Sequence, residues 1–294
     1  MMNPASDRHL EESLKDFNDR VSEYETEGTN AQLLDAYVNR GCVLSMMGSY
    51  VSALDDFDEA DLLIRIMESA GESADAGVFV KTYISRGELR AENDAPGMAE
   101  DYARAAERID EADSGNGRFD GKTLVNACLG CCADLLEAGY PSGTIPFTEK
   151  AEKILAGKND VWSLNRYVET MNTAGQAALD LGNPELSLEY LDRAISVCGR
   201  LMSEEKLEDV MSAVSVMVSR GDAHLELGRK EDAVKDFEGA VTALEILYEQ
   251  GREDAGELLI GFHRDVAEIL MSLSETEKAE VHLIKALKIS AGER

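Results

Sequence analysis

The first part of the chain places apolar residues at helical spacing. They recur at intervals of 4, 3, 4 and 3 residues, at Leu10, Leu14, Phe17, Val21 and Tyr24. These intervals put the apolar side chains on one face of a helix, and most of the remaining positions are polar or charged. We therefore predict one amphipathic helix over residues 7–27, which packs on the following segment as a cap.

The rest of the chain repeats a single pattern. A small residue recurs in steps of 43 to 46 residues, at Gly41, Gly87, Gly130, Gly175, Gly221 and Ala267. A series of alanines recurs in the same steps, at Ala60, Ala105, Ala151, Ala194, Ala240 and Ala286. Positions that stay small mark places where two backbones approach closely. The two series predict six helix–turn–helix units.

The first unit carries the pattern most completely, with Gly41, Tyr50, Ala53, Phe57 and Ala60 at fixed offsets. These residues resemble the signature of the tetratricopeptide repeat, a helix–turn–helix unit that stacks into solenoids. The resemblance implies an all-α fold, a right-handed α-α superhelix of six helical hairpins behind an N-terminal helix. The family's repeat has 34 residues, so the longer period predicts helices of about 17–22 residues.

The spacing also sets the expected boundaries. We expect residues 1–35 to form the N-terminal cap, and residues 36–294 to form one continuous solenoid. The six repeats are expected at about 30–72, 76–114, 121–158, 162–202, 205–249 and 252–291.

Composition and charge exclude several classes of protein and of partner. Hydrophobic residues make up 44% of the chain, enough to build a core, so disorder is excluded. The 58 acidic and 29 basic residues give a net charge of −29, which argues against nucleic acid and against anionic membrane surfaces. The N-terminus lacks the apolar core of a signal peptide, and no run approaches a membrane span. A cytoplasmic protein is expected.

Arginine and aspartate appear in the same repeats. In repeats one, two and five, arginine precedes the repeat glycine and aspartate precedes the large residue of the second helix. Both are missing from the other three repeats. We predict ion pairs that bridge the two helices of a unit, with a structural role. The pairs are Arg40–Asp56, Arg86–Asp101 and Arg220–Asp236.

By the same resemblance, the first helices line a concave face that binds a peptide or a partner helix. Its expected lining has an apolar floor and acidic walls. The residues are Asp35, Val38, Cys42, Met46, Ile84, Glu88, Glu92, Asp134, Glu169, Asn172, Gln176, Asp180, Asp222, Leu225, Glu226 and Glu268. The Lys and Asn set with which some family members grip a terminal carboxylate is missing from these positions.

Other candidate chemistry is weaker. Cys128, Cys131 and Cys132 suggest a metal or redox motif, but no further ligand pair accompanies them, and packing beside Gly130 is the favoured explanation. The loop at 115–123 ends like a phosphate-binding loop, yet it has Asn116 where that motif needs glycine. The four histidines are scattered, although those of the last repeat are expected to be neighbours. No metal or cofactor is expected.

The leading hypothesis is therefore a non-catalytic scaffold for protein–protein interaction. It would bind a basic and apolar segment in the acidic concave groove. One alternative is a structural or assembly protein that acts through its ends or convex face. Another is a metal or redox regulator that uses the cysteines. The last helix, predicted over residues 275–290, has apolar residues on more than one stripe, so a homodimer through that helix is an additional hypothesis.

Overall fold

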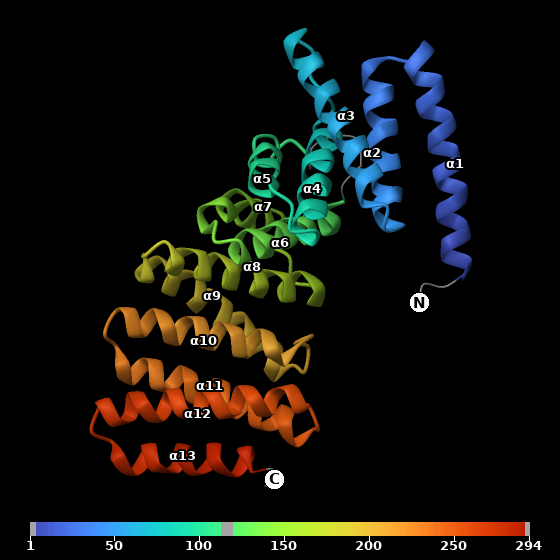
Figure 1. Ribbon diagram of the computed structural model, residues 1–294. Helices are drawn as coiled ribbons and strands as arrows, with labels where there is room; N and C mark the ends of the chain where they lie inside the picture. Colours follow the sequence, from blue (N-terminus) through green and yellow to red (C-terminus); the bar gives the residue numbers. More distant parts are fainter. Residues whose placement is uncertain (1–3, 113–119, 292–294) are drawn as a thin grey trace. The chain divides into compact units, whose positions relative to one another are not determined.

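The computed structural model describes residues 4–112 and 120–291. In these residues the chain forms thirteen α-helices and one 3-10 helix, without a strand (Figure 1). The chain divides into two compact units, Met1–Lys150 and Ala151–Arg294, so the boundary falls inside α7 (Ile145–Leu155). The all-α fold of helical hairpins expected from the sequence is confirmed.

The first unit begins with α1 (Pro4–Glu27), which packs on α2. It continues with α2 (Asn30–Met46), α3 (Tyr50–Ser69), α4 (Ala76–Glu92), α5 (Met98–Ala106), α6 (Gly121–Glu137) and η1 (Pro141–Thr144). Helix α2 pairs with α3, α4 pairs with α5, and the first helices α2, α4 and α6 contact one another in turn. Val21 of α1 is buried.

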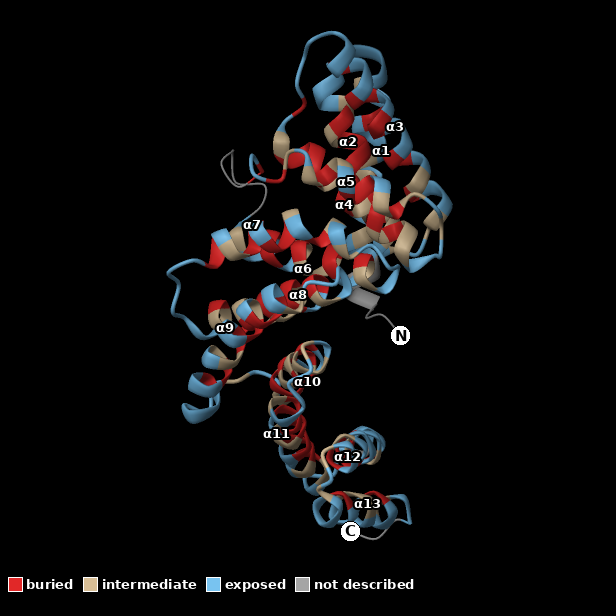
Figure 2. Ribbon diagram, turned by 90° about the vertical axis from the view of Figure 1, so that its left-hand side faces the viewer, coloured by how far each residue is buried: buried red, intermediate tan, exposed pale blue. Residues whose placement is uncertain are grey.

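The second unit is a stack of three hairpins. Its helices are α8 (Val161–Asp180), α9 (Pro184–Ser203), α10 (Val210–Glu226), α11 (Lys230–Glu249), α12 (Glu253–Ser272) and α13 (Thr276–Ser290). Within each hairpin the two helices pack together, and α9 packs on α10 as α11 packs on α12. Figure 2 shows that the buried residues lie on the facing sides of these helices.

Local sequence explains where the helices begin and end. Thr29 starts α2 with a capping box, in which its side chain accepts from the Gln32 N–H and the Gln32 side chain accepts in return. Asp75, Asp120 and Asp160 cap the first helices that follow. Helix α2 ends in a Schellman turn, because Gly48 takes a φ of +72° that most residues avoid.

The small residues of the repeat fit against a large side chain of the second helix. A Cβ on Gly87 would lie 2.4 Å from the Tyr102 ring, and one on Gly221 would lie 2.7 Å from Phe237. At Gly130 the expectation of close approach is wrong. A Cβ on Gly130 would have a Glu88 oxygen as its nearest neighbour, at 4.0 Å. The second helix of that repeat has the small Thr148 where the other repeats have a large residue.

The expected helix lengths are wrong for part of the chain. Most helices have 17 to 20 residues, but α5 has 9, α7 has 11 and α13 has 15. Helix α5 ends at Ala106, where i→i+3 turns replace the helical pattern and bury Ile109. Two prolines explain why α7 is short, because a proline is tolerated only at the start of a helix. Pro141 opens η1, and Pro146 lies in the first turn of α7.

Apolar contacts between successive hairpins form the core of the second unit. One cluster joins α8, α9 and α10 around Met171 and Leu191, both fully buried. A second joins α10, α11 and α12 around Leu244 and Leu259. In the described part of the chain, no helix is both long and apolar enough to cross a bilayer.

Candidate partner-binding groove

The sixteen residues predicted to line a groove all lie on first helices, from α2 through α12. Two of them are wrong as lining residues. Val38 is only 1% exposed and Ile84 only 4%. Each follows a buried residue by four positions and precedes the repeat glycine by three. Such spacing puts Val38 on the same buried stripe as Leu34 and Gly41, facing the second helix.

The other fourteen keep part of their surface accessible. The half-buried ones are Asp35, Cys42, Glu88, Asp134, Glu169, Asn172 and Leu225. The exposed ones are Met46, Glu92, Gln176, Asp180, Asp222, Glu226 and Glu268.

A cleft between α10 and α12 in the second unit brings several of these residues together. Its volume is about 530 Å³, and Phe237 and Phe262 form its floor as a stacked pair with ring centroids 6.4 Å apart. The predicted Asp222, Leu225 and Glu268 line it. The remaining lining residues are Val218, Lys230, Asp265, Ile269 and Ser272.

Carboxylates outnumber the single cation in this cleft. Lys230 on α11 donates from Nζ to Ser272 Oγ at 3.0 Å. Burial raises the pKa of Asp222, and the charges of Asp265 and Glu226 raise it further. Burial likewise raises the pKa of Asp265, with a contribution from Glu268. Repulsion between neighbouring carboxylates disfavours their charged form, and a nearby cation relieves it.

Sequence reasoning missed Phe262, Asp265 and Ile269. They recur at intervals of three and four along α12, followed by Ser272 at the next interval of three. This is one face of a helix, so the periodicity alone contained the signal. Extrapolation from Ala267, the small residue of the sixth repeat, gave Glu268 but missed these three, because they lie five and two positions before it and two after it, outside the offsets that the family resemblance supplies.

Helix α8 carries polar side chains that contact the next hairpin. Asn172 donates from Nδ2 to Ser215 Oγ at 2.9 Å, while its buried Oδ1 has no hydrogen-bond partner among the described residues. Arg166 pairs with Glu169 at 2.9 Å and with Glu208 at 2.8 Å. An unmet buried acceptor costs free energy.

The first unit carries its own acidic cluster, where α4 meets α6. Burial raises the pKa of Glu88 to about 7, and Asp134 and Glu92 contribute. The Tyr102 hydroxyl donates to Asp134. Glu92 and Asp134 also line a polar cleft of about 540 Å³.

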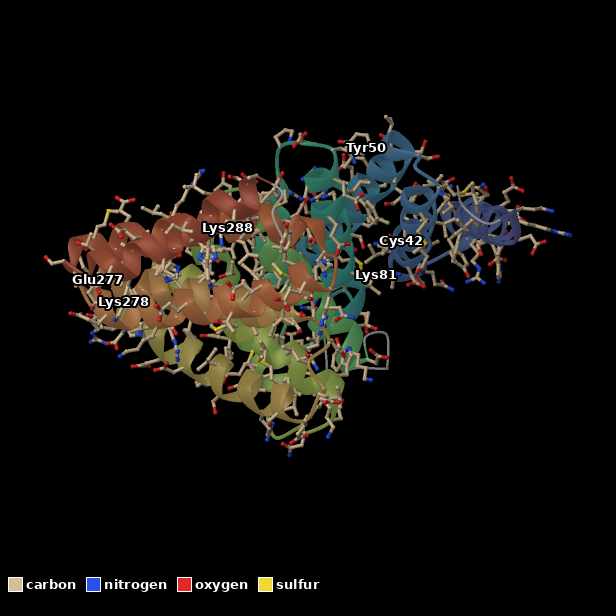
Figure 3. All side chains as sticks on the ribbon, turned by 90° about the horizontal axis from the view of Figure 1, so that it is seen from below. Cys42, Tyr50, Lys81, Glu277, Lys278 and Lys288 are labelled. Atoms are coloured by element: carbon tan, nitrogen blue, oxygen red, sulfur yellow. The ribbon has the colours of Figure 1, made fainter. Side chains whose placement is uncertain are left out.

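Between α2 and α4, polar side chains bridge the first helices. Lys81 donates from Nζ to Asn39 Oδ1 at 2.9 Å, and Cys42 Sγ lies 3.7 Å from Ser85 Oγ. Figure 3 labels Cys42 and Lys81, which lie close together on these two helices. A lysine here makes this part of the first unit less acidic than the α4–α6 cluster.

The three predicted arginine–aspartate pairs lie at ion-pair distance. Arg40 grips both carboxylate oxygens of Asp56, from Nε at 2.8 Å and Nη2 at 2.6 Å. Arg86 donates twice to one oxygen of Asp101, at 3.0 and 2.6 Å. Each pair joins the two helices of a hairpin.

The third pair also reaches the neighbouring hairpin. Arg220 Nη2 lies 2.5 Å from Asp236, and its Nη1 donates to Asp192 on α9 at 3.0 Å. The arginine therefore ties α10 both to its own second helix and to the preceding one.

The cysteine cluster has the properties of a packed core. Cys128, Cys131 and Cys132 are each 0% exposed, and burial raises the pKa of each thiol above its usual value. Protonated, buried thiols are poor nucleophiles and poor metal ligands. Among the residues that the structure describes, no group of three or more His, Cys, Asp or Glu side chains is placed to hold a metal ion.

The remaining candidates are the histidines and the phosphate-loop-like segment. His263 and His282 are neighbours, with their Nδ1 atoms 3.0 Å apart. Burial, together with His282, lowers the pKa of His263 to about 4, so both rings pack as neutral groups near neutral pH. Most of the segment at 115–123 falls within residues 113–119, outside the described residues.

Comparison with known proteins supports the repeat architecture. A family model described as tetratricopeptide repeat matches residues 168–199 and 214–243, which lie on the α8–α9 and α10–α11 hairpins. No curated protein matches the sequence.

Several solved structures resemble the fold. The crystal structure of BtubC (BKLC) from P. vanneervenii is similar over 96% of this chain and 91% of that one, with 16% identity and a TM-score of 0.51. A crystal structure of MamA is similar over 70% of this chain and 95% of that one, with 16% identity and a TM-score of 0.45. The apo form of the quorum sensor NprR from B. thuringiensis is similar over 97% of this chain and 84% of that one, with 11% identity and a TM-score of 0.40. At such identities, the BtubC likeness supports the fold alone.

Proposed function

We propose that this chain, a tetratricopeptide-repeat protein, is a non-catalytic scaffold that holds a basic and apolar segment of a partner protein. The segment occupies the cleft between α10 and α12. The observation that carries the proposal is the combination of a stacked Phe237–Phe262 floor with three carboxylates around it. Apolar side chains of the ligand contact the floor, and its lysine or arginine side chains meet the carboxylates.

The neighbouring α8 face extends this site within the same unit. Helices α8 and α10 are in contact, and Asn172 on α8 bridges to Ser215 on α10 by a hydrogen bond of 2.9 Å. The exposed Gln176 and Asp180 continue the polar lining along α8.

The experiment uses a defined probe. A fluorescein-labelled peptide of about 12 residues, built from Lys-Lys-Leu-Leu units, presents both chemistries on one amphipathic helix. Fluorescence anisotropy measures its affinity for the full chain, and for a groove variant with Asp222→Asn, Asp265→Asn and Glu268→Gln. The variant is expected to bind about tenfold more weakly, since each partly exposed ion pair contributes about 0.5 kcal/mol.

A matched variant controls for the loss of charge. Glu185→Gln, Glu189→Gln and Glu231→Gln remove three exposed carboxylates from the second helices α9 and α11. Its affinity is expected to stay within about twofold of the wild type, because these charges lie outside the cleft. Equal weakening in both variants would reject the groove as the binding site and leave only a general effect of net charge.

A structural or assembly role is the second candidate function, and one observation favours it. The last helix leaves large apolar side chains in solvent, with Val281 and Ile284 each 53% exposed and Leu287 65% exposed. Apolar residues gathered on one exposed helix face mark an interaction surface. A homodimer through α13 is the form of assembly that we propose. The cysteine-based regulator has no comparable support, because its thiols are buried.

A further inference from the structure

The outer face of α13 carries an ordered pattern of charge and apolarity. Ala279 and Ala286 form the buried side of this helix. At 100° per residue, the opposite side is the stripe of Glu277, Val281, Ile284 and Lys288, at intervals of 4, 3 and 4. All four are exposed. Figure 3 labels Glu277 near the start of the helix and Lys288 near its end.

This stripe is complementary to itself when reversed. Its order along the helix is acidic, apolar, apolar, basic. An antiparallel copy, related by a two-fold axis between positions 282 and 283, sets Glu277 against Lys288 of the other copy. The same operation sets Val281 against Ile284. The alternating intervals of four and three are those that let two helices interlock their side chains along a seam.

We propose that a second copy of this chain docks on α13 through this stripe, forming an antiparallel, two-fold symmetric helix pair. The proposal gives the assembly role its register, and it is independent of the groove between α10 and α12. Two-fold contacts are the commonest form of self-association, and they require a self-complementary surface of this kind. Each dimer contains two copies of the apolar contact and two of the ion pair.

The two charged residues of the stripe remain available for ion pairs with a second copy. Among the described residues, neither Glu277 nor Lys288 makes an ion pair within the chain. The flanking lysines are already neutralised, Lys278 by Glu275 at 2.5 Å and Lys285 by Glu245 at 2.7 Å. One pair of short helices makes a small contact, so we expect a reversible dimer rather than an obligate one.

Charge exchange gives the sharpest test. Sedimentation equilibrium of the full chain at protein concentrations up to about 200 µM measures the dimer dissociation constant. Glu277→Lys alone and Lys288→Glu alone each place like charges opposite one another at both ends of the seam. Each is expected to weaken the dimer about tenfold. The double variant, E277K with K288E, restores opposite charges and is expected to return to within about threefold of the wild type.

Two further variants complete the experiment. Ile284→Asp puts a charge into the apolar centre and is expected to leave only monomer, while its circular dichroism spectrum remains that of the wild type because the side chain is exposed. The groove variant at Asp222, Asp265 and Glu268 is expected to dimerise normally, which separates this interface from the peptide site. A wild type that stays monomeric overturns the proposal. A double variant as weak as the two single variants also overturns it.

Discussion

At the scale of single residues, a glycine is required where a ring lies against the helix backbone. Gly87→Ala puts a methyl group against Tyr102, whose hydroxyl is held by Asp134 and whose ring has little room to move. Overpacking costs about 1–3 kcal/mol, and the better helix propensity of alanine returns about 1 kcal/mol. We expect a net loss of about 1 kcal/mol, measured by urea unfolding followed by circular dichroism.

Gly130→Ala is the matched control for that substitution. Space is available at this position, so only the propensity gain applies, and stability is expected to rise slightly. If both substitutions changed the free energy of unfolding equally, close packing would not be the reason for glycine at position 87. The repeat period located both glycines, and it also gives the residue opposite that distinguishes them: Tyr102 in one hairpin, Thr148 in the other.

Buried ion pairs impose a second requirement at this scale. The Asp101 side chain is 2% exposed and accepts from both Arg86 and Arg90. Asp101→Asn removes a carboxylate that both guanidinium groups contact, but Arg86 Nη1 keeps Asp58 at 2.9 Å and Asp61 at 3.5 Å. The expected loss is therefore about 2 kcal/mol, below the about 3–5 kcal/mol of stranding a buried charge. Urea unfolding measures the loss. Asp232→Asn, which breaks an exposed pair with Lys235, should leave the unfolding midpoint nearly unchanged.

At the scale of helices, the sequence determines starts better than ends. N-caps such as Thr29 and Asp160 are local signals, readable from a few neighbours. Helix α5 ends at Ala106 without a glycine or proline near that point, and the turns that follow bury Ile109. A contact of that kind depends on the fold, and residue spacing does not reveal it. Val38 and Ile84 show the same limit, since their burial depends on which face meets the second helix.

The junction of α4 with α6 predicts a pH effect on stability. The folded protein raises the pKa of Glu88 to about 7, above its ordinary value of 4.5. Between these two values the folded state binds more protons than the unfolded state, so this group makes stability fall as pH rises from about 4.5 to 7. Glu88→Gln removes that contribution. The variant is therefore expected to have a flatter dependence of Tm on pH, and to exceed the wild type at pH about 8.

Thermal unfolding between pH about 5 and 8 tests this expectation. Glu100→Gln, on the exposed side of α5, serves as the control and should retain the slope of the wild type. An unchanged slope in the Glu88→Gln variant would mean that this carboxyl group titrates as it does in the unfolded chain.

At the scale of the whole molecule, the charge of −29 acts on any partner before contact. Attraction at a distance speeds association with a cation and is screened by salt, whose Debye length falls from about 10 Å at 0.1 M to about 3 Å at 1 M. Contacts with the Phe237–Phe262 floor are apolar and respond little to salt. For the Lys-Leu probe, added NaCl is therefore expected to lower the association rate by about tenfold or more, with a smaller change in the dissociation rate.

Stopped-flow anisotropy separates the two rates, and a peptide with glutamate in place of lysine provides the comparison. Its association should be slow at low salt and should speed up as NaCl is added, because screening then removes repulsion. Retained binding of the lysine peptide at high salt would assign the residual affinity to the apolar floor. An association rate indifferent to salt for both peptides would show that the acidic residues neither attract nor select the partner.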